Sequence, residues 1–250
     1  MNKLEICLSV LLFSLPFGAA AETVPSFVIA AIADPARAAD SKADARRHPA
    51  ELAAFAQVKP GDVVVDLIPG GGYFTRIFSA IVGPKGHVYA IWPAEYAKVD
   101  GDEVPATQAL VKDPHYANVT LLFEPAAQFS VPVQADVVWT SQNYHDYPDP
   151  FMGPTDPKLL DAGVFAALKP GGVFVVVDHV AEAGSGLRDT NTLHRIDPAV
   201  VKAQVPAAGF VFDAESDVLR NTTDDHKLVV FDKAIRGHTD QFAFRFRKPE

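Results

Sequence analysis

The chain has 250 residues, of which 48% are hydrophobic and 10% aromatic, and its formal net charge is −9. This apolar content is enough for one sizeable core, so we expect a folded protein of one domain, or at most two. An acidic chain lacks the basic surface that displaces phosphate counterions, which argues against a general nucleic-acid binder and favours small molecules or proteins as partners.

The first 21 residues have the pattern of a cleavable signal peptide. A short basic start with Lys3 precedes an apolar run over residues 6–17, and three alanines follow at positions 19–21. The run is shorter than the roughly 20 residues that a membrane span requires. We therefore expect a periplasmic or secreted protein whose mature chain has no membrane anchor. Cys7 is the only cysteine, so that mature chain would have no disulfide.

Residues 22–58 are rich in alanine and charge and predict an N-terminal helical segment. The pairs Asp34-Pro35 and His48-Pro49 each resemble the first turn of a short helix. Between them, Arg46 and Arg47 could reach a ligand in the turn described next, although such a charged cluster more often forms a solvated face.

The stretch from Val63 to Arg76 reads as a strand, a tight glycine-rich turn and an amphipathic helix. Glycine lets the backbone adopt positive φ and approach a ligand closely, and the start of the following helix offers unpaired N–H groups. An acid at the strand end can hold those amides or meet ligand donors. We predict a nucleotide-binding turn, although a glycine turn without a ligand has the same pattern. The expected ligand-binding residues are Asp66, Pro69, Gly70, Gly71, Gly72 and Tyr73.

Strands and helices then alternate to the end of the chain. Short joints between strand, helix and strand are the arrangement that a parallel sheet needs. A longer joint, residues 219–240, is typical of a lid or binding loop. The predicted strands are one beginning at Val63 and those at residues 87–92, 119–123, 135–140, 172–178, 210–218 and 241–247. After the turn, one predicted helix begins at Tyr73, and two more cover residues 157–168 and 197–208.

Motifs along nearly all of the mature chain are shared with one family. They are Lys59-Pro60-Gly61, Asp66 with Pro69–Arg76, Val82–Ala90, Asn143–Asp146, Leu168–Gly172, Thr239–Phe242 and Phe246–Pro249. With these motifs the chain resembles the class I S-adenosylmethionine-dependent methyltransferases, and within them the predicted secreted bacterial methyltransferases. The resemblance implies a Rossmann-like α/β domain over residues 59–250, with a seven-stranded, mostly parallel sheet whose last strand is antiparallel. It also implies S-adenosylmethionine as cofactor and a small-molecule acceptor.

The family pattern places an acid that binds the cofactor ribose at the end of the second strand. Here Trp92-Pro93 stands at that place and Glu95 is the nearest acid. The resemblance therefore implies Glu95 for the ribose and Trp92 for stacking on the base, although both could instead be packing and surface residues. Ile68 stands where the class has its first glycine.

A polar and aromatic segment, residues 140–147, follows the fourth strand. In an open parallel sheet, ligands bind outside the carboxyl ends of the strands, so we expect the acceptor here. Asn143 could hold a ligand amine or carbonyl. His145 could take a proton from the acceptor while Asp146 orients its ring, and its pKa would be roughly 6.5 before any shift by Asp146. The alternative is that Asn143 and Asp146 cap a turn and His145 is merely exposed.

Two other chemistries have less support. His145, Asp146, Asp178 and His179 could meet at one sheet edge and bind a metal, but they lack the spacing of a zinc motif, so we predict no metal site. No Gly-x-Ser-x-Gly elbow supports a serine hydrolase.

The sequence does not name the acceptor or the oligomeric state, but it favours an exported methyltransferase that acts on a small molecule. Two alternatives stay open. The chain could be a methyltransferase-fold periplasmic binding or accessory protein without methyl transfer. The same pocket could also serve another reaction on an anionic small molecule, with Arg220 or Arg236 as anchors.

Overall fold

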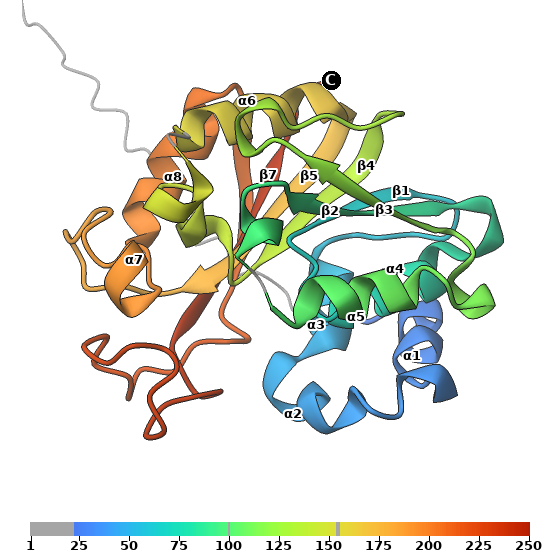
Figure 1. The fold of residues 1–250 in the computed structure, drawn as a ribbon, viewed down its shortest axis with the longest axis horizontal. Helices are drawn as coiled ribbons and strands as arrows, with labels where there is room; N and C mark the ends of the chain where they lie inside the picture. Colours follow the sequence, from blue (N-terminus) through green and yellow to red (C-terminus); the bar gives the residue numbers. More distant parts are fainter. Residues whose placement is uncertain (1–22, 100, 154–155) are drawn as a thin grey trace, which may run out of the picture.

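The computed structural model describes residues 23–99, 101–153 and 156–250, so the predicted signal peptide lies outside the described residues. A seven-stranded sheet with the order β3-β2-β1-β4-β5-β7-β6 forms its centre (Figure 1). All neighbouring strands pair in parallel except β7, which is antiparallel to both β5 and β6. The predicted mostly parallel sheet with an antiparallel last strand is confirmed. The strands are β1 (Val63–Leu67), β2 (His87–Pro93), β3 (Val119–Glu124), β4 (Ala135–Ser141), β5 (Leu168–His179), β6 (Val211–Ser216) and β7 (Gln241–Arg247).

Helices cover both faces of the sheet (Figure 1). Because side chains alternate along a strand, Val64 packs with α1, α3 and α4 in one core cluster, while Val65 and Leu67 belong to a second cluster with α6 and α8. None of the described helices is both long and apolar enough to cross a membrane. The helices are α1 (Ser26–Ile32), α2 (Asp44–Arg47), α3 (Pro49–Phe55), α4 (Tyr73–Val82), α5 (Glu103–Leu110), α6 (Pro157–Ala167), α7 (Thr190–Leu193) and α8 (Pro198–Ala207).

The N-terminal segment differs in part from its prediction. A helix does begin at Pro49, but the one expected at Asp34-Pro35 is a single 3₁₀ turn, Pro35–Arg37. Asp34 caps that turn by accepting a hydrogen bond from the Ala36 amide at 2.9 Å. The helices α1, α2, α5 and α7 were not predicted. Pro25 precedes α1 in place of a capping side chain, and α2 and α7 are each about one turn long.

Candidate functional site

The turn after β1 has the backbone that its glycines predict. Gly70 and Gly72 adopt φ of +56° and +82°, and Gly72 is the N-cap of α4. Ile68, at the position of the class's first glycine, is left-handed as well, with φ of +52°. This conformation costs a β-branched residue about 1–2 kcal/mol. Two hydrogen bonds hold its peptide groups: the Ile68 amide donates to the Ile91 carbonyl at 2.8 Å, and the Ile68 carbonyl accepts from the Asn143 side-chain Nδ2 at 3.0 Å.

The strand order reverses between β1 and β4, and this turn lies at that point. Asn143, just past the end of β4, bonds the Ile68 carbonyl and so joins the two strand ends. Around Gly71 the space is open, since a Cβ added there would meet nothing within 4 Å. In open α/β sheets, ligands bind at the point where the strand order reverses.

Asp66 lies beneath the turn and is only 2% exposed. Its carboxylate accepts a hydrogen bond from the Thr75 hydroxyl of α4 at 2.6 Å. Burial raises the pKa of Asp66 to about 7, although the Thr75 hydroxyl and the nearby Arg47 charge act in the opposite direction. Near neutral pH the group therefore exists in both protonation states, and a ligand cation would favour the charged one.

Helix α5 covers one side of the turn. The Thr107 hydroxyl donates to the Gly70 carbonyl at 2.7 Å and accepts from the Trp92 indole N–H at 3.3 Å. Trp92 is completely buried, with its ring 5.3 Å from that of Tyr96. The structure thus places Trp92 beneath α5 as a packing residue, linked to the turn through Thr107.

Two glutamates lie between β2 and β3, and their carboxylates face different parts of the fold. Glu95 accepts a hydrogen bond from the Ala126 amide at 3.0 Å and so faces the segment after β3. Glu103, in the first turn of α5, lies at the glycine turn, since a Cβ on Gly70 would be 3.4 Å from its Oε2. The sequence analysis did not single out Glu103. An acid at the start of the helix after the second strand was the available signal.

A cation lies on the N-terminal side of the turn. The Arg47 guanidinium stacks over the Tyr73 ring at 4.3 Å and over the Phe74 ring at 5.0 Å. Burial lowers its pKa, while the charges of Asp66 and Glu103 raise it. The Tyr73 hydroxyl is itself bonded to Asp44. Arg47 and Glu103 therefore place opposite charges beside the same glycine turn.

A second polar cluster lies at the carboxyl ends of β4 and β5. His145 Nδ1 is 2.8 Å from Asp178 Oδ1, and the His145 amide donates to Asp178 Oδ2 at 2.8 Å. The other ring nitrogen, Nε2, is 3.2 Å from Asp146 Oδ1 and 3.3 Å from His194 Nδ1. His145 and Asp146 are each 3% exposed and Asp178 is fully buried, so these contacts are made away from water.

The surroundings of His145 shift its pKa away from the roughly 6.5 of a free histidine. Burial lowers its pKa, but the Asp178 and Asp146 carboxylates more than offset this effect and raise the pKa to about 10. The sequence could not show that Asp178, which follows a different strand, bonds Nδ1. His179 is turned away to the Thr239 hydroxyl at 2.8 Å, and burial lowers its pKa to about 3.

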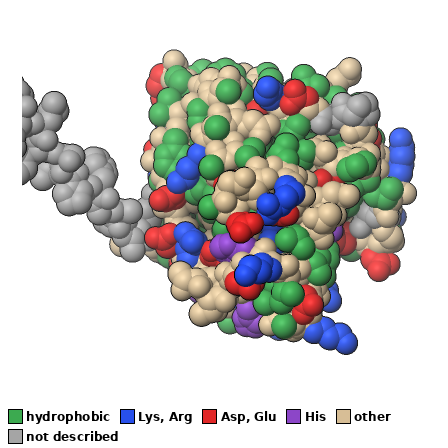
Figure 2. Space-filling model, turned by 90° about the vertical axis from the view of Figure 1, so that its left-hand side faces the viewer, with side chains coloured by type: hydrophobic (Ala, Val, Ile, Leu, Met, Phe, Trp, Pro, Cys, Tyr) green, Lys and Arg blue, Asp and Glu red, His purple; other side chains and the backbone are tan. Residues whose placement is uncertain are grey.

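The loop of residues 219–240 packs beside this cluster, at the lower left of Figure 1. Buried Arg195 binds Asp224 of the loop at 2.9 Å, and the Phe231 ring is 4.9 Å from that of His194. Farther along, Gly237 lies against Arg46, the residue before Arg47. Histidine, acidic and basic side chains gather on the face seen in Figure 2, which is the left side of Figure 1. One of the proposed anchors, Arg220, is engaged with Asp240 at 2.8 Å.

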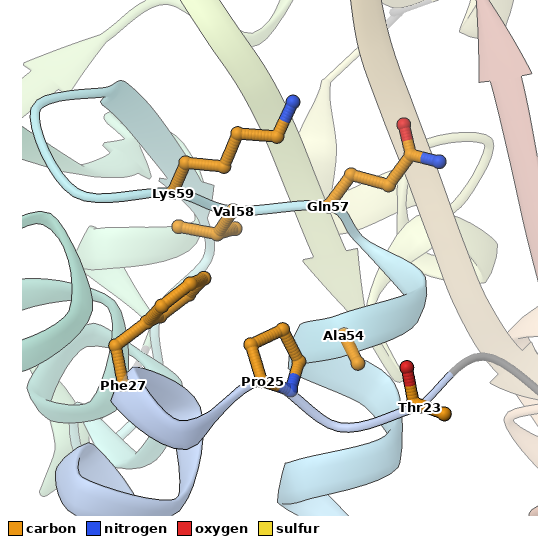
Figure 3. A pocket seen from close by; sticks show the side chains of 7 residues that line it. All are labelled: Thr23, Pro25, Phe27, Ala54, Gln57, Val58 and Lys59. Carbon is orange, nitrogen blue, oxygen red and sulfur yellow. The ribbon is translucent and has the colours of Figure 1, made fainter.

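A hollow of about 400 Å³ lies elsewhere, between the start of α1 and the end of α3 (Figure 3). Its wall includes Lys59, which precedes β1, so it is at the amino edge of the sheet and away from the glycine turn. Its other lining residues are Thr23, Pro25, Phe27, Ala54, Gln57 and Val58. We assign it no ligand.

Comparison with known proteins supports the fold. No protein-family model and no curated protein matches the chain in sequence. A SAM-dependent methyltransferase from Aquifex aeolicus matches with a TM-score of 0.52 and 17% identity, over 88% of this chain and 96% of that one. The glycopeptide N-methyltransferase MtfA, solved with S-adenosylmethionine, matches with a TM-score of 0.54 and 16% identity, over 83% of this chain and 87% of that one. The [4+2]-cyclase SpnF matches with a TM-score of 0.58 and 18% identity, over 85% of this chain and 82% of that one. The chain therefore has the Rossmann-like fold of the class I methyltransferases.

Proposed function

We propose that the protein binds S-adenosylmethionine at the turn after β1 and transfers its methyl group to a small molecule at the carboxyl ends of β4 and β5. One observation carries this proposal: a glycine turn with left-handed Gly70 and Gly72 lies where the strand order reverses. The fold is shared with methyltransferases, one of them solved with this cofactor.

The charges around the turn suit the cofactor's polar groups. The methionine part carries an ammonium and a carboxylate, and the ribose carries two hydroxyls. Glu103 would accept hydrogen bonds from the cofactor, because its carboxylate lies beside Gly70, whereas the Glu95 carboxylate faces the segment after β3. Arg47 would pair with the cofactor carboxylate from the other side of the turn.

Catalysis here would depend mainly on alignment. S-adenosylmethionine supplies a methyl group that is already activated as a sulfonium, so the chain must place the acceptor in line with it. The acceptor would form its bond to the methyl carbon as the carbon–sulfur bond breaks, and its proton would pass to water. His145 is held by Asp178 and Asp146 and donates rather than accepts near pH 7, so its proposed role is to bind and orient the acceptor.

The two acids provide a matched test. Glu103→Gln should weaken S-adenosylmethionine binding about tenfold or more, since hydrogen bonds to charged groups contribute about 1.5–3 kcal/mol. Glu95→Gln should leave the affinity within about twofold of the wild type. Equilibrium binding of the cofactor, with circular dichroism to check the fold, makes the comparison. Equal affinities in all three proteins would contradict the assignment of Glu103, and a loss confined to Glu95→Gln would move it to Glu95.

A second candidate function is binding, or another reaction, without methyl transfer. Side chains of the protein itself pack against the turn, which favours this second function. Ile68 is buried, and Leu110 lies so close to Gly72 that a Cβ added to Gly72 would be 2.5 Å from Leu110 Cδ1. One solved structure with this fold is a [4+2]-cyclase. Cofactor binding without release of the demethylated product during incubation with pooled small molecules would favour this reading.

We also propose export to the periplasm or the medium, on the basis of residues 1–21. Cell fractionation followed by N-terminal sequencing tests this proposal. The expected product is found outside the cytoplasm and begins near Glu22. A cytoplasmic protein that still begins at Met1 would contradict it.

A further inference from the structure

Three side chains of the second polar cluster bring metal-binding atoms close together. His145 and Asp146 follow β4, and His194 follows α7, so the chain brings them together only by folding. One ligand atom from each lies within 4.8 Å of the others. We propose that His145, Asp146 and His194 form a binding site for a divalent transition-metal ion of the zinc type.

The distances match the size of such an ion. His145 Nε2 is 3.2 Å from Asp146 Oδ1 and 3.3 Å from His194 Nδ1, and the third side of the triangle is 3.9 Å. A point equidistant from these atoms lies about 2.0 Å from each, and Zn²⁺ binds histidine nitrogen and carboxylate oxygen at about 2.0–2.2 Å. Two imidazole ligands favour zinc, iron or cobalt over magnesium and calcium, which prefer oxygen.

Asp178 prepares His145 to be a ligand. Its Oδ1 lies 2.8 Å from His145 Nδ1, so Nδ1 keeps its hydrogen, and a metal ion would replace the proton on Nε2. Metal-bound histidines usually donate their other N–H to a carboxylate in this way. The second oxygen of Asp178 accepts the His145 amide at 2.8 Å, which fixes the carboxylate itself.

The site is held firmly and has one open side. His194 closes α7 in the left-handed conformation, with its amide bonded to the Thr190 carbonyl at 3.0 Å. The side chains of His145 and Asp146 are 3% and 5% exposed, whereas that of His194 is 29% exposed. Three protein ligands and an approach from the His194 side are the arrangement of a metal site that keeps a position for a water or a substrate.

This arrangement also indicates which class of acceptor would receive the methyl group, and this step rests on the proposed function. A metal ion held by these three side chains would lower the pKa of a hydroxyl bound at its open position. We therefore expect an acceptor with a hydroxyl that can reach the ion. Metal binding itself needs neither methyl transfer nor S-adenosylmethionine.

The test is a metal titration of the purified full chain after treatment with a chelator. We expect one Zn²⁺ per chain, and Co²⁺ at the same site with the intense visible absorption of a low-coordinate ion. His194→Ala and Asp146→Ala should each weaken Zn²⁺ binding about 100-fold or more. Asp178→Asn should weaken it about 10- to 100-fold without abolishing it. His115→Ala is the control, because His115 is exposed and bonds Asp34 instead, and it should bind Zn²⁺ like the wild type.

X-ray absorption of the zinc-loaded wild type keeps the proposal testable if a variant fails to fold. We expect two histidine ligands and otherwise oxygen. The absence of stoichiometric Zn²⁺ binding, full binding by folded His194→Ala and Asp146→Ala, or a spectrum without histidine would each overturn the site. Because no cofactor is present in these measurements, failure of the proposed methyl transfer would leave them unchanged.

Discussion

Replacing the buried carboxylate of Asp66 should change how stability depends on pH. The pKa of Asp66 is about 7 in the folded protein and about 3.8 when exposed. Between these values the folded state binds the proton and the unfolded state does not, so stability falls as pH rises from about 4 to 7 and then levels off. This one group should remove about 2–3 kcal/mol of stability between pH 5 and pH 8.

Asp66→Asn removes the titration but keeps an oxygen that can accept the Thr75 hydroxyl, which lies 2.6 Å from the carboxylate. Urea unfolding of both proteins at pH 5 and pH 8 measures the difference. The free energy of unfolding of the variant, relative to that of the wild type, should rise by about 2–3 kcal/mol between pH 5 and pH 8.

Asp161 supplies a matched control. It is fully buried, its pKa is also raised to about 7 by burial, and the Tyr144 hydroxyl donates to it at 3.0 Å. Asp161→Asn should remove a similar pH dependence while leaving cofactor affinity unchanged, because Asp161 lies on α6 and away from the glycine turn. If Asp66→Asn retains the wild-type pH dependence, the assignment of a partly protonated acid beneath the turn is refuted.

Three further outcomes follow from the same contacts. Gly72→Ala should cost about 2–4 kcal/mol of folding stability from its positive φ and the approach to Leu110, and it should cost less in a Leu110→Ala background. The same cost in both backgrounds, measured by urea unfolding, would contradict the clash. Arg195→Met should cost about 3–5 kcal/mol because Asp224 would remain buried without its partner, and a loss below 1 kcal/mol would contradict this. If residues 219–240 close over bound ligand, limited proteolysis within them should slow when S-adenosylmethionine is added, whereas an unchanged rate counts against a cover.

The sheet could be predicted because its signals are local. The phenylalanines at 242, 244 and 246 alternate with residues of another kind, and the strand they predict, Gln241–Arg247, is the one observed. The glycine turn was equally readable, since Gly70 and Gly72 have the positive φ that only glycine adopts without cost.

The surroundings of the site could not be predicted in the same way. Helix α5 has an acid, Glu103, in its first turn, but the placement of this carboxylate beside Gly70 depends on packing rather than on sequence pattern. His194 joins His145 from a distant part of the sequence, and its place was taken in the prediction by His179, the neighbour of Asp178. The raised pKa of His145 likewise comes from carboxylates that only the fold brings together.

Calorimetric titration of the purified protein with S-adenosylmethionine, and separately with its demethylated product, tests the central claim most directly. We expect each ligand to give a saturable heat with one molecule bound per chain, and Glu103→Gln to bind S-adenosylmethionine with lower affinity. The absence of a saturable heat with either ligand, from a protein whose circular dichroism shows it folded, would contradict the claim that the turn after β1 is a cofactor site.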